Sequence, residues 1–214
     1  GFGHMLNYNH EQAIACYMNV TELDPTCAMA WWGIAYCVSS NYNWTPGLGS
    51  GYDPIQQAIS LKAGCTALEQ DLIDALAERH SEEARDAADP SVLNMGNSPE
   101  LNIAFAKAMA PLYLKYKGNL DVAAIYVEAL MNLNAWQLWN KNTETGEITP
   151  LDNNTLLCVK VMEDAFENIS GAKQHIALCH LYCHCLELSP FPERALPAAD
   201  VLRTAMPSMG HLYV

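Results

Sequence analysis

The chain has 214 residues, with 11 basic and 24 acidic side chains and a formal net charge of −13 at pH 7. A nucleic-acid-binding surface and an anionic membrane surface both require clustered Lys and Arg, and the sequence contains no such cluster. Half of the residues are hydrophobic, yet no apolar run reaches the roughly 18–20 residues of a membrane span.

The first part of the chain predicts two helices. Apolar residues at helical spacing predict a helix over residues 10–23. Asn9 is the expected N-cap, with Gln12 three residues on, and Pro25 ends the helix. A second helix is predicted over 27–39, followed by a loop rich in Gly and Pro.

The rest of the chain reads as further helices with short connections. Asp53 is expected to cap a helix that starts with Pro54 and ends near Gly64. Residues 80–97 are polar and rich in turn formers, and 140–151 suggest an exposed loop or a small hairpin. The remaining helices are predicted over residues 66–79, 99–116, 120–132, 153–167, 173–188 and 191–205. About nine helices with almost no strand pattern predict an all-α fold of antiparallel helix pairs.

Several segments carry the pattern of a helical repeat. A small residue at position 13 lets two helices approach closely, Asp24-Pro25 ends a second helix of a pair, and Ala-Met-Ala-Trp-Trp-Gly-Ile-Ala-Tyr opens the next. This resembles the tetratricopeptide repeat. Similar segments lie at 9–13, 24–25, 27–35, 41–43, 180–184, 189–190, 192–200 and 210–212. They resemble one large, poorly characterised group of tetratricopeptide-repeat proteins, with the pattern His-x-x-x-His, then Ser-Pro-x-Pro-Glu-Arg-Ala-Leu-Pro-Ala-Ala-Asp, then Gly-His-Leu.

The resemblance implies a single domain over residues 1–214, an α-solenoid. Repeat-like segments are expected over 1–40 and 172–214, with an irregular helical middle over 53–168. Members of the group continue beyond the Gly-His-Leu segment with further His residues. A site that needs those residues would be completed by another chain or be missing.

Both ends of the chain predict assembly. Residues 1–8 resemble the end of one helix and 210–214 the start of another, and neither resembles a polar capping repeat. Head-to-tail stacking would bury both ends in a ring or a filament. The alternative is a fragment of a longer solenoid. The residues expected at the contact are Phe2, His4, Met5, His211, Leu212 and Tyr213. The apolar excess fits buried surface between copies as well as a filled helical core.

Two features favour an oxidising, extracellular compartment. Asn-x-Ser/Thr sequons that predict N-linked glycans lie at Asn19, Asn43, Asn153 and Asn168. The chain also has eight Cys, an even number. Folding about the helix connections brings Cys16 close to Cys37 and Cys158 close to Cys183 or Cys185, while Cys27 with Cys65 is a third candidate pair.

A histidine cluster is the main candidate for chemistry. His180 and His184 are four residues apart on one predicted helix face, with Glu187 on the same face. With His175 and His211 they form a candidate zinc or copper site. The alternative is that these side chains pack between helices and bond to the backbone. No catalytic residues are identified, because the sequence lacks the nucleophile, phosphate-loop and metalloprotease motifs.

The sequence therefore favours a non-enzymatic, secreted and glycosylated structural protein that self-assembles head to tail or binds protein or peptide partners. A metal-binding protein or metal-dependent enzyme built on His180 and His184 is the alternative. A third hypothesis, a cytosolic peptide-binding scaffold, predicts free thiols and no glycan.

Overall fold

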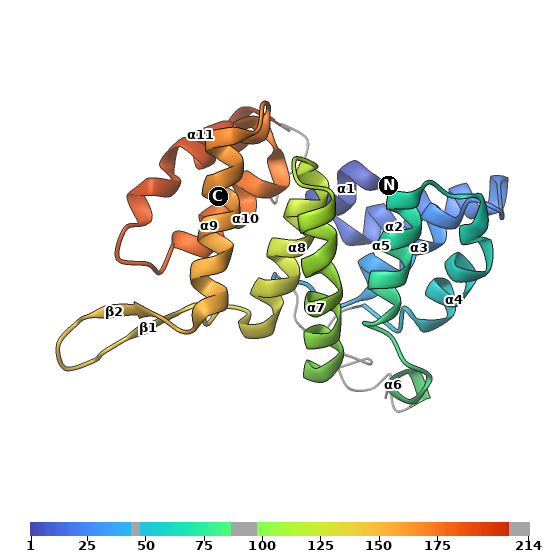
Figure 1. Ribbon diagram of the computed structural model, residues 1–214, viewed down its shortest axis with the longest axis horizontal. Helices are drawn as coiled ribbons and strands as arrows, with labels where there is room; N and C mark the ends of the chain where they lie inside the picture. Colours follow the sequence, from blue (N-terminus) through green and yellow to red (C-terminus); the bar gives the residue numbers. More distant parts are fainter. Residues whose placement is uncertain (44–47, 87–97, 206–214) are drawn as a thin grey trace. The chain divides into compact units, whose positions relative to one another are not determined.

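The computed structural model describes residues 1–43, 48–86 and 98–205 (Figure 1). Eleven α-helices and one two-stranded sheet lie in these ranges, so the predicted all-α class is confirmed. The chain divides into unit 1, Gly1–Tyr116, and unit 2, Lys117–Val214. The single domain and the solenoid arrangement stay predictions.

Unit 1 is built from seven α-helices and one short 3-10 helix in its described part. Their bounds are α1 Phe2–Leu6, α2 His10–Leu23, α3 Ala28–Val38, α4 Tyr52–Leu61, η1 Lys62–Gly64, α5 Ala67–Ala77, α6 Glu82–Asp86 and α7 Pro99–Lys115. Each helix packs mainly on its neighbours in sequence: α2 on α3, α3 on α4, α4 on α5 and α5 on α7. Consecutive helices are therefore in contact, and their arrangement as antiparallel repeat pairs stays a prediction.

Local signals explain where most of these helices begin. Thr66 and Glu69 form a reciprocal capping box at the start of α5, and Ser98 caps α7. Asn9 does precede α2, but its side chain forms no cap hydrogen bond. The predicted cap at Asp53 is wrong, because α4 begins at Tyr52 and Asp53 lies in its first turn. There its negative charge still interacts favourably with the positive, N-terminal end of the helix dipole.

A glycine allows α2 and α3 to approach closely. A Cβ added at Gly33 would lie 2.4 Å from the ring of Tyr17, which is buried between the two helices. The Tyr17 hydroxyl donates to the Met5 sulfur at 3.8 Å, so the same ring also holds α1. The expectation that small residues permit a tight helix crossing is confirmed at this position.

Unit 2 contains four α-helices, three 3-10 helices and a β-hairpin in its described part. The bounds are α8 Leu120–Met131, η2 Asn132–Asn134, β1 Trp139–Lys141, β2 Ile148–Pro150, α9 Asn153–Asn168, η3 Ala172–Gln174, α10 Ile176–Leu186, η4 Pro192–Ala195 and α11 Leu196–Ala205. Helix α10 is central, because it packs on α8, α9 and α11. Most of its side chains are apolar, and eight of its eleven residues are buried.

The hairpin confirms one of the two alternatives for residues 140–151. Strands β1 and β2 pair antiparallel, with Asn140 opposite Thr149, and the hairpin projects away from the helices of unit 2 (Figure 1). The short helix α6 was not predicted, because residues 82–86 lack an apolar stripe.

The last two predicted helices are each divided. Residue His175 is extended and separates η3 from α10, because its side chain caps α10 by accepting the Leu178 N–H at 3.3 Å. Residues 192–195 form a 3-10 turn before α11. Residues of α9, α10 and α11, and of the short helices between them, line a pocket.

Candidate functional site

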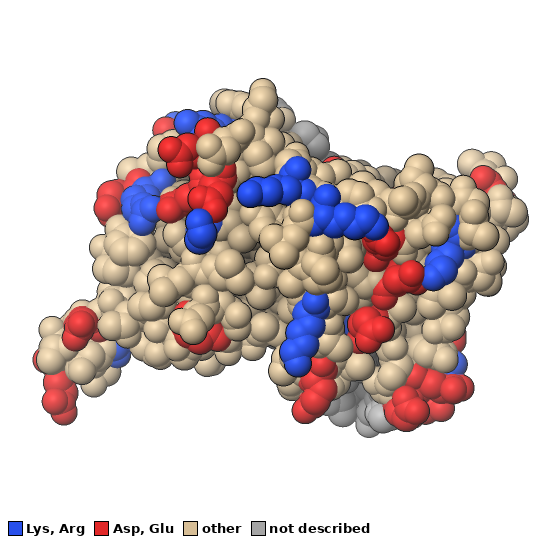
Figure 2. Space-filling view, viewed as in Figure 1, with Lys and Arg blue, Asp and Glu red and all other residues tan. Residues whose placement is uncertain are grey.

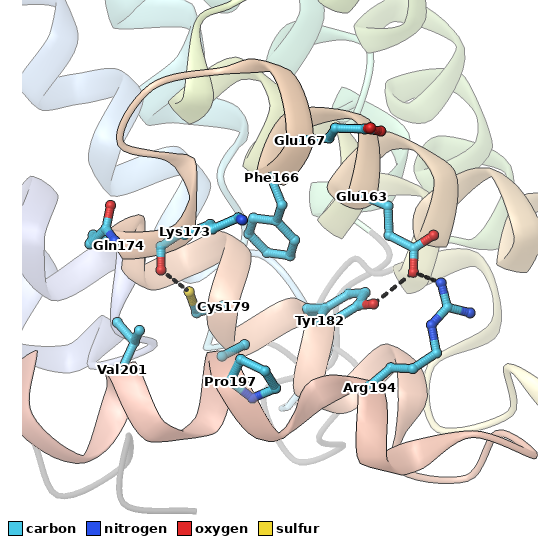
Figure 3. Close-up of a pocket in the computed structure, with 11 residues that line it drawn as sticks. Glu163, Phe166, Glu167, Lys173, Gln174, Cys179, Tyr182, Arg194, Pro197 and Val201 are labelled. Carbon is cyan, nitrogen blue, oxygen red and sulfur yellow. Dashed lines mark hydrogen bonds and ion pairs between the residues drawn. The ribbon is translucent and has the colours of Figure 1, made fainter.

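A pocket of about 520 Å³ lies within unit 2 (Figure 3). Its lining comes from consecutive elements at helical spacing: Glu163, Phe166 and Glu167 from α9, Lys173 and Gln174 from η3, Cys179 and Tyr182 from α10, Arg194 from η4, and Pro197, Ala198 and Val201 from α11. The volume falls within the roughly 300–1,000 Å³ of ligand pockets.

The floor of the pocket is apolar and aromatic. The rings of Phe166 and Tyr182 meet edge to face, with centroids 5.2 Å apart. Ala198 and Val201 on α11 lie opposite these rings, one helical turn apart. A ring edge and small aliphatic side chains favour an apolar guest over a charged one.

One side of the pocket is closed by a hydrogen-bonded charge cluster. The Tyr182 hydroxyl donates to Glu163 Oε1 at 2.7 Å, and Arg194 Nη2 pairs with the same oxygen. The Arg194 guanidinium also lies 4.9 Å above the Phe191 ring. Burial, and then the bond to Glu163, raise the pKa of Tyr182 above its ordinary value, so the phenol stays protonated and keeps donating.

Outside this cluster, the rim of the pocket carries charges of both signs. Glu167, Lys173 and Gln174 are all exposed. In the described part of the chain neither the Glu167 carboxylate nor the Lys173 ammonium forms an ion pair. Figure 3 shows the Lys173 side chain reaching over the pocket toward the Phe166 ring. Both charges are therefore available to a guest.

The pocket cysteine is not an activated nucleophile. The Cys179 thiol donates to the Lys173 carbonyl at 3.4 Å. Burial, followed by the nearby Cys183, raises the pKa of Cys179 to about 12. Because the thiolate is the reactive species, such a thiol is inert near neutral pH. The pocket therefore supports binding rather than covalent chemistry.

The predicted metal ligands are not assembled into a metal site. His175 uses both ring nitrogens: Nδ1 accepts from Leu178, so Nε2 donates to Asp121 Oδ1 at 3.1 Å. His180 and His184 do lie together, with ring centroids 4.6 Å apart, and His184 Nδ1 bonds to Glu187 Oε1 at 3.0 Å. Among the described residues, no group of three or more His, Cys, Asp or Glu is placed to hold a metal ion. His211 lies outside the described residues.

All eight cysteines carry free thiols. Burial, and then the charge of Cys185, raises the pKa of Cys158. The pKa of Cys65 is raised by burial, then by the charges of Glu69 and Cys27. Two predicted pairs therefore lie within electrostatic range, and Cys16 and Cys37 both flank Tyr17. The disulfides at Cys16–Cys37, Cys27–Cys65 and Cys158 with Cys183 or Cys185 are not formed, and their formation under oxidising conditions stays a prediction.

The predicted glycosylation sites have accessible side chains in three cases. Asn19, Asn153 and Asn168 are exposed, whereas Asn43 is half-buried. Thr155, the third residue of the Asn153 sequon, is buried and donates to the Leu138 carbonyl at 2.9 Å. The most open sequons are therefore those of Asn19 and Asn168.

The predicted assembly residues have different environments. Phe2 is 42% exposed, whereas Met5 is buried and accepts the Tyr17 hydroxyl. The expectation that Met5 is presented to another copy is therefore wrong, because it is held within unit 1. His4 is half-buried. His211, Leu212 and Tyr213 lie outside the described residues.

Unit 1 holds a group of buried polar side chains that the sequence did not indicate as a cluster. Arg79 Nε donates to Asn102 Oδ1 at 2.9 Å, and its Nη2 donates to the Ser40 carbonyl at 2.7 Å. Its guanidinium lies 5.3 Å from the Phe105 ring centroid. His10 Nδ1 donates to the Cys37 carbonyl at 3.0 Å. These bonds join α2, α3, α5 and α7.

The unit 2 pocket was also missed from the sequence. None of the residues that line it was identified from the sequence as part of a binding site. The spacing of 163, 166 and 167, and of 197, 198 and 201, marks one face on each helix. A sequence shows which residues share a face but not which two faces meet.

The charged side chains on one face of the molecule have both signs. On the face shown in Figure 2, Lys and Arg are interspersed with Asp and Glu and separated by wide uncharged areas. None of the helices in the described ranges is both long and apolar enough to cross a membrane. Comparison with protein-family models, with curated proteins and with solved structures found no match for this chain.

Proposed function

We propose that this chain is a non-enzymatic helical scaffold that binds other protein chains, including copies of itself. The observation that carries the proposal is the exposed apolar surface of the first helices. Leu23 is 88% exposed, and Val20, three residues earlier on the same face of α2, is 38% exposed. Met18 and Phe2 add 51% and 42% exposed side chains on α2 and α1, which pack together.

An apolar surface of this kind gains free energy when it is covered. Burying one Leu or Phe side chain contributes about 1.5–3 kcal/mol. Two or three such side chains supply part of the roughly 8 kcal/mol that micromolar association requires, and the rest must come from the surrounding contact. Head-to-tail assembly into a ring or filament would use this surface as one of its two contacts.

The absence of activated groups supports binding over catalysis. The pocket thiol has a raised pKa, and the Glu163 carboxylate is occupied by Tyr182 and Arg194. A catalytic acid or base needs a pKa near the working pH and access to the substrate. The described residues of unit 2 offer instead a shaped, mostly apolar surface with fixed polar groups, which is typical of recognition.

Size-exclusion chromatography with light scattering, followed by negative-stain microscopy, tests the assembly. We expect concentration-dependent oligomers that Leu23→Glu shifts toward the monomer. Leu156→Glu is the matched control, because Leu156 is 50% exposed on α9 of unit 2. A wild-type chain that stays monomeric at high concentration, or an equal shift in both variants, would contradict the proposed contact.

We also propose that the chain is secreted and glycosylated. Exposed Asn19 and Asn168 support this part of the proposal. Asn19 and Leu23 are one turn apart on α2, so a glycan on Asn19 would cover the same face that the assembly uses. Intact mass before and after deglycosylation tests the glycans, and Asn19→Gln is expected to increase self-association. An unglycosylated chain with reduced thiols from its natural source would favour the cytosolic scaffold.

A further inference from the structure

The unit 2 pocket has the volume of a ligand-binding pocket and a lining that suits a large apolar side chain together with part of the segment that carries it. Its floor consists of Phe166, Tyr182, Ala198 and Val201, and its volume is about 520 Å³. The rim residues are exposed, so the pocket opens to solvent. A guest therefore has one face against the floor and one face in water. An amphipathic guest meets both conditions.

The charges around the rim divide into a satisfied pair and an available pair. Arg194 and Tyr182 both bond to Glu163, so this corner is fixed in place. Lys173 and Glu167, also at the rim, form no ion pair with any described residue. A complementary guest carries a carboxylate for Lys173 and a cation for Glu167.

We infer that this pocket binds a short peptide segment of a partner protein, with one apolar anchor flanked by an acidic and a basic residue. The inference rests on the proposed function, because it names the chemistry by which the scaffold would recognise a partner. The apolar anchor contacts Phe166 and Tyr182, its acidic neighbour pairs with Lys173, and its basic neighbour pairs with Glu167.

The chemistry of the rim favours a peptide over an anionic amphiphile. A fatty acid would match Lys173 and the floor, but its carboxylate would be repelled by Glu167, and its exposed face would leave apolar surface in water. A peptide supplies both charges and a polar outer face. Rim charges set orientation and specificity, while the buried anchor supplies most of the affinity.

The test uses a phage-displayed library of random twelve-residue peptides panned on the full chain. The pocket-filling variant Val201→Phe is kept out of the selection and is used only in the binding measurement that follows. Enriched peptides are then labelled and measured by fluorescence anisotropy at low ionic strength. We expect Val201→Phe to weaken binding at least about tenfold, because it occupies the anchor site.

Charge reversals test the orientation without disturbing the fold, since both side chains are exposed. Lys173→Glu and Glu167→Lys are each expected to weaken binding about three- to fivefold at low salt. The matched controls are Lys141→Glu and Glu147→Lys on the exposed hairpin, which change the net charge equally and are expected to change nothing. The double exchange of Lys173 and Glu167 is expected to select peptides with the reversed order of charges.

Three outcomes would overturn the inference. The first is that the enriched peptides bind Val201→Phe as tightly as the wild type, with circular dichroism showing that both chains are folded. The second is that Lys173→Glu and Glu167→Lys weaken peptide binding no more than the control substitutions on the hairpin do. The third is that sodium dodecanoate binds the pocket while no peptide is enriched, which would assign the pocket to a lipid. Because self-association depends on Leu23 in unit 1, loss of peptide binding with intact assembly contradicts this inference alone.

Discussion

The two units place their polar side chains differently. In unit 1, buried polar groups such as Arg79, Asn102 and Ser40 bond to one another and to the backbone, and thereby join helices distant in sequence. In the pocket region of unit 2, the charged groups lie at an exposed rim above an apolar floor. Breaking a buried polar network lowers the free energy of unfolding strongly, whereas replacing an exposed charge changes it little. We therefore expect substitutions in the Arg79 network of unit 1 to be destabilising and substitutions of the charged residues at the pocket rim of unit 2 to be tolerated.

The largest expected effect is that of Arg79→Met. The substitution removes the donors to Asn102 and Ser40 and leaves buried acceptors unsatisfied. The expected loss is about 3–5 kcal/mol of the free energy of unfolding. Urea unfolding followed by circular dichroism measures it.

Hydrogen exchange locates that effect and tests the comparison directly. In Arg79→Met, peptides from α3, α5 and α7 should exchange faster, while peptides from α9–α11 should change less. Equal acceleration in both units would mean that the network does not belong to unit 1 alone.

The second expected effect is a pH dependence that arises from α10. Burial is the main cause that raises the pKa of Cys179 and of Cys185, each to about 12 from 9.0. Between these values the folded chain holds protons that the unfolded chain has lost, so stability falls as the pH rises from about 9 toward 12. At pH 10.5 the expected loss is about 1–2 kcal/mol per thiol.

Urea midpoints of the wild type and of Cys179→Ala/Cys185→Ala at pH 8 and pH 10.5 check this. The double variant should have the flatter pH dependence, because general titration of Lys and Tyr affects both chains equally. Parallel slopes would contradict the role of these two thiols.

Two glycines give the next contrast, because each is required for a different reason. At Gly33 a Cβ would meet the Tyr17 ring at 2.4 Å, so Gly33→Ala is expected to cost about 1–3 kcal/mol through overpacking. Gly171 has φ +83° with open space around it, so Gly171→Ala is expected to cost about 1–2 kcal/mol through backbone strain alone.

The double variant Gly33→Ala/Tyr17→Leu separates these causes in thermal unfolding. Removing the ring should recover part of the Gly33→Ala loss relative to Tyr17→Leu alone. No ring substitution should rescue Gly171→Ala. An additive cycle at Gly33 would exclude the steric explanation.

The smallest expected effect is at an exposed ion pair of unit 2. Arg203 and Asp200 are three residues apart on α11, and their side chains are about two-thirds exposed. Arg203→Met should change the free energy of unfolding by less than about 0.5 kcal/mol. It also serves as the matched Arg→Met control for Arg79, and a loss as large as that of Arg79→Met would remove the distinction between buried and rim charges.

Much of the secondary structure could be predicted from the sequence. The bounds of α2 agree with the prediction because an apolar stripe ends at Asp24-Pro25. The break at His175 could not be predicted, since a histidine cap depends on the Leu178 N–H and on Asp121 of another helix. The proximity of His180 and His184 did follow from their spacing, whereas the contact of His175 with Asp121 did not.

The sequence by itself determined most of the helices and their apolar stripes, because these depend on neighbours within a few residues. Only the tertiary structure decided that Arg79 is buried among Ser40 and Asn102, and that α9, α10 and α11 enclose a pocket. Those features depend on how helix faces pack against each other, and many pairings of the same stripes satisfy local patterning equally well.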